Sequence, residues 1–267
     1  MLDKSRHAVY DGAMQKILGK MRRAIEDYSM IEAGDHVVVG LSGGKDSLLL
    51  TTALNEFRRF SDKPFTLTAV TVDLGFKDSS LQELDLLVDY CQKIGVPHII
   101  EKTDIAEIVF NIRKEKNPCA LCSKMRRGCL NNKAVSIGSH KIALGHHADD
   151  VLETMLLSLF YEARFSTFQP KSFMDRTGVT LIRPFIYIEE HEITSMVKNL
   201  SLPVFFNCCP ANKHTERETM KNLVKTLCGE VPYAKDQMLS AIFHPERNNL
   251  WDKVKRDAQC KSIIEDD

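Results

Sequence analysis

Six consecutive residues near the start of the chain have the composition of a phosphate-binding loop: Ser42, Gly43, Gly44, Lys45, Asp46 and Ser47. The loop follows a short apolar run at residues 36–41 and precedes a helical pattern that starts at residue 48. Glycines allow backbone N–H groups to turn towards an anion, and the following helix adds the positive end of its dipole. Lys45 adds a positive charge, and Ser42 and Ser47 add hydroxyl groups. The loop therefore predicts a site for the phosphates of a nucleotide.

This loop differs from the two commonest nucleotide-binding loops. The nucleoside-triphosphatase loop has four residues between its glycines and a Ser or Thr after its lysine, whereas Asp46 follows Lys45 here. The G-x-G-x-x-G spacing of dinucleotide-binding proteins is also absent. A glycine-rich turn without a ligand is the alternative, but the six residues between a strand and a helix favour the ligand.

Two cysteines separated by two residues, Cys119 and Cys122, can bring both sulfurs to one metal or cluster. The pair alone also fits a redox dithiol or half of a zinc site, although a zinc ribbon would need a second such pair. The adjacent Cys208 and Cys209 supply one further ligand, because neighbouring residues rarely both bind one centre. Three thiolates would leave one iron of a four-iron cluster open to an external sulfur. The other cysteines are expected to be structural thiols: Cys91, Cys129, Cys228 and Cys260.

A group of polar residues at 145–150 ends one predicted strand and begins a helix. Because ligands of open α/β sheets bind at the carboxyl ends of strands, Gly145 and His146 are expected near the nucleotide, together with Asp73 at the end of another strand. Asp149 is predicted to help hold Mg²⁺ on the phosphates. Asp150 is either a site residue or the N-cap of the helix, with Glu153 three residues later.

Basic residues lie beside the cysteine pair: Lys124, Arg126 and Arg127. A solvated basic turn is the ordinary interpretation, and contact with RNA phosphates is the functional one. Lys plus Arg equals Asp plus Glu, 36 against 36, so the composition gives no global nucleic-acid signature and RNA binding would need a local patch. Three phenylalanines are expected either to pack in the core or to hold a displaced base: Phe165, Phe168 and Phe173.

The elements that must position these residues alternate along the chain. Strands are predicted at residues 36–41, 65–72, 96–101 and 141–145, and helices at residues 12–30, 48–57, 81–94 and 151–163. This alternation predicts an α/β fold, a doubly wound, mostly parallel sheet with helices on both faces. We expect an N-terminal helical segment at residues 1–30, a nucleotide-binding domain at 31–205 and a helical C-terminal extension at 206–267.

The composition is that of a soluble globular protein, with 43% hydrophobic and 27% charged residues in 267. No apolar run approaches the roughly 20 residues needed to span a bilayer, and the N-terminus lacks the pattern of a signal peptide. We therefore expect a cytoplasmic protein without a membrane partner, in which the eight cysteines are thiols or metal ligands.

The phosphate loop resembles the signature of the PP-loop ATP pyrophosphatases, α/β proteins that cleave ATP between its α- and β-phosphates. With it, four further motifs occur in the order seen in the tRNA-cytidine 2-sulfurtransferase family, over residues 15 to 220 approximately. The motifs are residues 119–128, 145–154, 159–161 and 183–187. The chain departs from the family pattern at Ala148 and at Glu162-Ala163, within the expected substrate region.

The resemblance implies ATP, Mg²⁺ and a [4Fe–4S] cluster held by Cys119, Cys122 and Cys209, with Cys208 as the substitute for Cys209. It implies catalytic roles for Lys45, Asp46 and Cys209, and a reaction in which cytosine O2 is adenylated and replaced by sulfur, giving 2-thiocytidine at position 32 of the anticodon loop. The implied partners are tRNA and a sulfur donor such as a cysteine desulfurase, and a homodimer is possible. The alternatives are a 2-thiouridine synthase or an amide-forming ligase of the same superfamily, an ATP-binding redox sensor, and a zinc-stabilised RNA-binding module.

Overall fold

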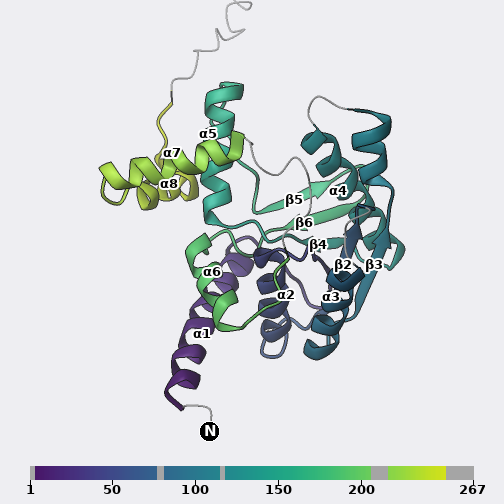
Figure 1. Ribbon diagram of the computed structural model, residues 1–267. Coiled ribbons are helices and arrows are strands. Elements are labelled where there is room, and N and C mark those ends of the chain that lie inside the picture. Colours follow the sequence, from purple (N-terminus) through teal and green to yellow (C-terminus); the bar gives the residue numbers. More distant parts are fainter. Residues whose placement is uncertain (1–3, 77–80, 115–117, 206–215, 251–267) are drawn as a thin grey trace, which may run out of the picture. The chain divides into compact units, whose positions relative to one another are not determined.

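The computed structural model describes residues 4–76, 81–114, 118–205 and 216–250 (Figure 1). The chain divides into two compact units, Met1–Lys225 and Thr226–Asp267. The second unit contains the end of α7, the helix α8 (Ala234–Phe243) and the short 3₁₀ helix η2 (Pro245–Arg247). The domain boundaries expected at residues 30 and 205 remain a prediction.

A six-stranded sheet forms the centre of the first unit, in the order β3-β2-β1-β4-β6-β5. Its strands are β1 (His36–Gly40), β2 (Thr66–Asp73), β3 (His98–Lys102), β4 (Lys141–Ala143), β5 (Lys171–Met174) and β6 (Val179–Ile182). All pairings are parallel except that of the edge strand β5 with β6. The predicted α/β fold with a mostly parallel sheet is therefore confirmed.

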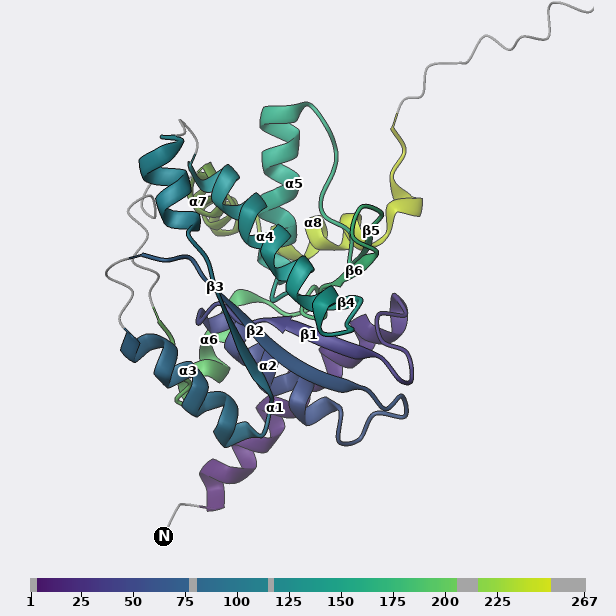
Figure 2. The same ribbon diagram turned by 90° about the vertical axis from the view of Figure 1, so that its right-hand side faces the viewer.

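Helices cover both faces of this sheet (Figure 2). The helices of the first unit are α1 (Lys4–Asp27), α2 (Lys45–Phe57), α3 (Leu81–Ile94), α4 (Pro118–Ser136), α5 (Ala148–Glu162), α6 (Glu190–Asn199) and the start of α7 (Glu216–Glu230), with a π-helical turn η1 (Glu107–Ile112). In α4, Leu130 and Ala134 pack on Val38 and Ile142 of the sheet, while α2 packs against α1 and α6. Because β1 is buried from both sides, its valines form a continuous apolar run.

The structure differs from the sequence-based expectation at several elements, and it adds the helices α4 and α6 to those predicted. The hairpin of β5 and β6 was not predicted, because its four-residue strands lie at the sheet edge and lack a long alternating pattern. The first helix starts at Lys4 rather than near residue 12, and α5 starts at Ala148 rather than residue 151. Among the described residues, no helix is long and apolar enough to cross a membrane.

Candidate functional site

The predicted nucleotide contacts gather where the strand order of the sheet reverses. From β1 the order runs through β2 and β3 on one side, and through β4 and β6 on the other. The loops that leave β1 and β4 therefore open into one crevice at the carboxyl edge, where open α/β sheets bind ligands. The approach is close, because a Cβ added at Gly145 after β4 would lie 3.0 Å from the carbonyl carbon of Asp46.

Two serines hold the phosphate loop in shape. Ser47 Oγ accepts a hydrogen bond from the Ser42 N–H at 3.1 Å and donates one to the Gly44 carbonyl oxygen at 2.9 Å. Gly44 is the N-cap of α2 and makes no side-chain cap. Since the first N–H groups of a helix have no intrahelical partner, the loop can present them to an anion, as the sequence predicts.

Gly43 is required by its backbone conformation and by a close neighbour. Its φ of +80° lies in the left-handed region, where a side chain is strained. A Cβ at this position would also lie 2.7 Å from Cδ2 of Phe205. The Phe205 N–H donates a hydrogen bond of 3.0 Å to the Gly43 carbonyl oxygen, so the segment that ends at Phe205 packs directly on the loop.

A pocket of about 410 Å³ opens beside the loop. Its lining includes six of the residues predicted to contact a nucleotide: Ser42, Asp46, Ser47, Asp73, Gly145 and His146. Apolar side chains of Val72, Leu74 and Phe76 form another part of the wall. The other three predicted contacts do not line this pocket: Gly43, Gly44 and Lys45. An apolar wall facing a polar loop is the usual composition of a small-molecule site.

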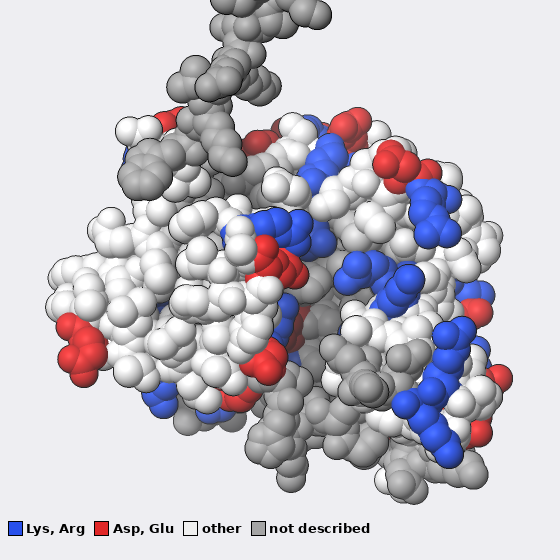
Figure 3. Space-filling view, turned by 90° about the horizontal axis from the view of Figure 1, so that it is seen from above, with Lys and Arg blue, Asp and Glu red and all other residues white. Residues whose placement is uncertain are grey.

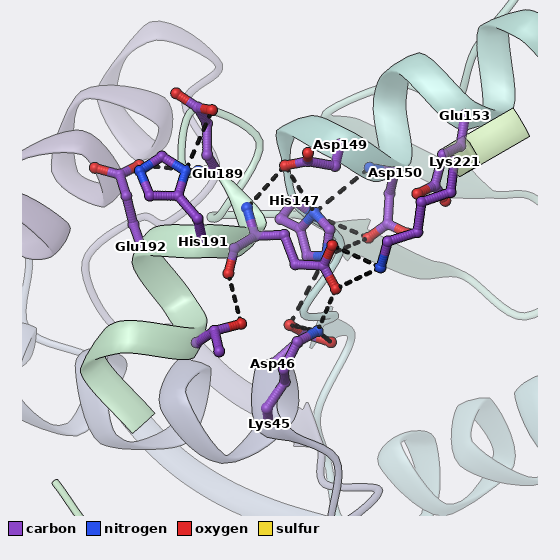
Figure 4. Close-up of polar contacts among 12 residues, drawn as sticks. Lys45, Asp46, His147, Asp149, Asp150, Glu153, Glu189, His191, Glu192 and Lys221 are labelled. Atoms are coloured by element: carbon purple, nitrogen blue, oxygen red, sulfur yellow. Dashed lines mark hydrogen bonds and ion pairs between the residues drawn. The ribbon is translucent and has the colours of Figure 1, made fainter. Parts of the chain in front are cut away.

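Lys45 is turned towards the N-terminus of α6 (Figure 4). Its ammonium lies 2.9 Å from Oδ1 of Asp46 and 3.1 Å from Oε1 of Glu190. Glu190 is in turn 2.7 Å from the ammonium of Lys221 on α7. Burial acts to raise the pKa of Glu190, but Lys221 and Lys45 outweigh burial and lower the pKa to about 2. Glu190 is therefore ionised and would compete with a phosphate for Lys45.

His147, rather than Asp150, caps the N-terminus of α5. The His147 N–H donates to Oδ2 of Asp150 at 3.0 Å, and the Asp150 N–H donates to Nδ1 of His147 at 3.4 Å. This reciprocal pair is a capping box. The interpretation of Asp150 as the N-cap is therefore wrong by three positions, and its carboxylate lines the pocket instead.

The predicted magnesium ligand Asp149 does not line the pocket. Its Oδ2 accepts a hydrogen bond of 2.7 Å from the Glu190 N–H, which holds the carboxylate at the N-terminus of α6. Successive helical residues point about 100° apart, so Asp150 can face the pocket while Asp149 does not. Among the described residues, no group of three or more His, Cys, Asp or Glu side chains is arranged to hold a metal ion.

Arg217 of α7 reaches the pocket from a distant part of the sequence. Its guanidinium lies 2.8 Å from Oδ1 of Asp150 and 3.4 Å from Oε2 of Glu153. Burial of Glu153, followed by the negative charge of Asp150, raises the pKa of Glu153 to about 7 even though Arg217 and Lys221 act in the opposite direction. Arg217 thus compensates two carboxylates in the first turns of α5.

His146 packs against Phe168 with the rings tilted by 45° and their centroids 5.0 Å apart, and the Arg183 guanidinium lies 4.9 Å from the centroid of the same Phe168 ring. Burial lowers the pKa of His146 to about 4, with Arg183 among the nearby cations that add to the effect. The imidazole is therefore neutral near pH 7. Of the three phenylalanines considered in the sequence, Phe168 packs beside the pocket, whereas Phe165 and Phe173 are exposed.

The first turn of α4 carries Cys119 and Cys122. Residues three apart lie on one face of a helix, so the two sulfurs can share a metal centre. Cys119 is exposed, and Cys122 packs near Leu74 of the pocket wall, one residue before the pocket-lining Ser123. Soft thiolates on one helix face suit an iron–sulfur cluster.

Of the remaining cysteines, the structure describes Cys91, Cys129 and Cys228. Cys91 is fully buried, which raises its pKa to about 12 and fits the predicted structural thiol. Cys129 lies apart from the pocket, in a groove beside Glu101 and Lys133, and burial raises its pKa. Cys228 in α7 is partly buried. The predicted third ligand Cys209, its alternative Cys208, and Cys260 lie outside the described residues.

The three basic residues beside the cysteine pair are exposed, and Arg126 and Arg127 also line the pocket, whereas Lys124 does not. No described carboxylate forms an ion pair with Lys124, Arg126 or Arg127. Figure 3 shows Lys and Arg side chains around a hollow in the face seen from above. The geometry therefore places two of the three predicted RNA contacts at the mouth of the site.

Four residues of the site were missed by sequence reasoning: Glu190, Arg217, Lys221 and Phe205. Glu190 belongs to an acidic stretch that begins two residues after the motif at residues 183–187, which was a usable signal. The two basic residues sit in a polar helix and carry no local signal, because such residues usually form a solvated face.

Comparison with known proteins identifies the family. The PP-loop domain family matches residues 14–227. A tRNA-cytidine(32) 2-sulfurtransferase of Pelobacter propionicus is 36% identical over 234 residues, covering 86% of each chain, and that of Syntrophotalea carbinolica is 34% identical, covering 93% of this chain and 96% of the relative. The fold is that of the U34-tRNA thiolase NcsA from Methanococcus maripaludis, solved with its [4Fe–4S] cluster, with a TM-score of 0.74 and 23% identity over 90% of this chain and 81% of that one. The chain therefore belongs to the PP-loop domain family and, within it, to the tRNA-cytidine(32) 2-sulfurtransferases.

Proposed function

We propose that this protein adenylates O2 of a cytidine in tRNA with ATP and replaces that oxygen with sulfur, in the cytoplasm. The name of its relatives specifies cytidine 32, so the product is 2-thiocytidine at that position. One observation carries the proposal: the phosphate loop and the helix with Cys119 and Cys122 border the same pocket. A redox sensor or an RNA-binding module has no need of that juxtaposition.

The pocket suits ATP in a defined orientation. The α2 N-terminus would bind the phosphates, and the apolar wall at Val72, Leu74 and Phe76 would hold the adenine. Asp46 lines the pocket beside the loop, so it replaces Asp149 as the proposed protein ligand of Mg²⁺. Magnesium commonly binds one or two carboxylates together with substrate phosphates, and it would neutralise their charge.

The reaction then has two substitution steps. Cytosine O2 bonds to the α-phosphorus, the bond to the bridging oxygen of the β-phosphate breaks, and pyrophosphate leaves. A sulfur nucleophile next bonds to C2, the C2–O bond breaks, and AMP leaves. The loop N–H groups would stabilise the charge that develops on the phosphate, and the neutral His146 lines the same pocket.

The proposed cluster ligands are Cys119, Cys122 and Cys209. Cys209 follows the pocket-lining Phe205 by four residues, a chain length that spans at most about 14 Å. A [4Fe–4S] cluster held by these three thiolates would leave one iron without a protein ligand and would supply a place for sulfur to bind. A sulfur donor such as a cysteine desulfurase, and a second copy of the chain, are the further proposed partners.

The test of function is the pair of products formed from ATP and unmodified tRNA under anaerobic conditions. We expect AMP, pyrophosphate and 2-thiocytidine, detected by chromatography and nucleoside mass spectrometry. Release of ADP and phosphate would contradict the adenylation, and 2-thiouridine would assign the chain to the rival thiolase. ATP binding without pyrophosphate would favour the redox sensor.

Metal content tests the cluster. Anaerobically purified protein should contain about four irons per chain, and Cys119→Ala, Cys122→Ala or Cys209→Ala should lose both iron and thiolation. Cys228→Ala is the matched control and should retain both. If Cys208→Ala removes iron while Cys209→Ala does not, the third ligand shifts by one residue, whereas zinc without iron would make the site structural.

A further inference from the structure

Three aromatic side chains at the end of α5 are exposed to solvent. Phe160 and Tyr161 are 58% and 57% exposed, and Phe165, just beyond the helix, is 67% exposed. We call these three residues the aromatic surface. The buried side of α5 consists of other residues, such as Val151, Leu152 and Leu156. Core packing therefore does not account for Phe160 and Tyr161, although they belong to one of the motifs shared with the family.

The helix α4, which also borders the pocket, presents a basic surface rather than an aromatic one. From Pro118 to Ser136 this helix has four basic residues and no acidic one. Lys133 is paired with Glu101 at 2.6 Å, but the other three lack a described carboxylate partner: Lys124, Arg126 and Arg127. Cations without a described acidic partner on one helix suit the phosphates of a nucleic-acid backbone.

Both surfaces are joined to the pocket by their own helices. Asp150 in the first turn of α5 and Arg126 and Arg127 of α4 line the pocket. Figure 2 shows α4 crossing one face of the sheet, whereas α5 follows β4 at the carboxyl edge, where these arginines also reach the pocket. Phe160 is ten residues along α5 from Asp150, or about 15 Å at the rise of an α-helix. A nucleotide inserted in the pocket would thus have its neighbours within reach of the aromatic surface.

We propose that the aromatic surface stacks on unpaired bases of an RNA loop while the α4 cations bind its backbone. This inference rests on the proposed function and specifies how the same site grips its substrate. RNA loops offer both of the chemistries that the two helices present, since unstacked bases pack on aromatic rings and phosphates pair with Lys and Arg. A protein partner of the aromatic surface would not explain the cations opposite. Tyr161 also bonds through its hydroxyl to Glu216, which orients the ring while it stays exposed.

The experiment compares Phe160→Ala and Phe165→Ala with a matched control, Phe60→Ala. Phe60 is 56% exposed but follows the C-terminus of α2, at the opposite edge of the sheet from the pocket. The probe is an anticodon stem–loop RNA with 2-aminopurine in the loop, bound to the full-length, cluster-loaded protein. Loss of one stacked base should weaken RNA affinity about 5- to 150-fold. It should also relieve part of the 2-aminopurine quenching, and ATP affinity should stay unchanged.

The salt dependence separates the two surfaces. Arg126→Ala should flatten the slope of log affinity against log salt by about one unit per lost contact, whereas the Phe variants should leave that slope unchanged. Unchanged affinity and quenching in both Phe variants would overturn the inference, as would a change from dimer to monomer with RNA binding intact. The proposed function fails in a different way, by the absence of pyrophosphate and AMP from the wild-type protein.

Discussion

The buried carboxyl group of Glu153 should make the free energy of unfolding depend on pH. In the folded chain Glu153 is only 6% exposed and its pKa is raised to about 7, from the ordinary value of 4.5. Between these two pH values the folded chain holds the proton more tightly than the unfolded chain. The free energy of unfolding should therefore fall as the pH rises from about 4.5 to about 7, and the whole cost is present above pH 7.

The size of this effect follows from the pKa change. At about 1.4 kcal/mol per pKa unit, a rise from 4.5 to about 7 corresponds to about 3 kcal/mol. Glu153→Gln keeps the shape and removes the ionisation, but it weakens the 3.4 Å contact with Arg217. Arg217 keeps its shorter contact with Asp150. We expect a net gain of about 1–2 kcal/mol at pH 8, because the neutral amide no longer has a buried charge to accommodate.

Urea unfolding of the metal-free wild type and Glu153→Gln, at pH 5 and at pH 8, measures the difference. At pH 5 most Glu153 side chains are protonated in the folded state, so the two proteins should differ little. At pH 8 the variant should have the higher midpoint with an unchanged slope. Equal midpoints at pH 8, or a less stable variant, would refute the argument and show that Arg217 fully compensates the carboxylate.

Three further predictions concern the loop and its charged neighbours. Gly43→Ala should cost about 1–2 kcal/mol of stability from φ alone, measured by urea unfolding, and should weaken ATP binding because it displaces Phe205; Gly34→Ala, at φ +88° with open space, is the matched control. Arg217→Ala should destabilise the protein by about 1–3 kcal/mol at pH 8, and added Glu153→Gln should recover part of the loss. In calorimetric titration Glu190→Gln should bind ATP more tightly and Lys45→Met more weakly; a weaker Glu190→Gln variant would contradict the competition for Lys45.

Local patterns were sufficient for the centre of the fold and for much of the site. The valines of β1, the two glycines after it and the helix that follows are contiguous, so one stretch of sequence determines the strand, the turn and the anion site. The cysteine pair was predictable for the same reason, since the spacing of Cys119 and Cys122 places both on one face of any helix. The reversal of strand order then brings Gly145 and His146 to the loop.

Side-chain direction was not predictable from the same patterns. Asp149 and Asp150 are adjacent and identical in type, yet only Asp150 lines the pocket, because the cap at His147 sets the rotation of α5. Lys45 follows the glycines as expected, but an acid from 145 residues further along the chain holds its ammonium. Only the folded chain brings these partners together, so no local spacing could reveal them.

The distant partners also give α7 a role in the site. Lys221 holds Glu190, Glu190 holds Lys45 of the phosphate loop, and Arg217 holds Asp150 at the pocket. All of these contacts lie within the first compact unit. A phosphate that bound Lys45 would break the ion pair between Lys45 and Glu190. Nucleotide binding should therefore leave Lys221 as the main cationic partner of Glu190. Two sets of ion pairs thus connect α7, the helix that follows Cys208 and Cys209 in sequence, to the pocket. One set leads through Glu190 to Lys45 of the phosphate loop, and the other leads to Asp150 of α5.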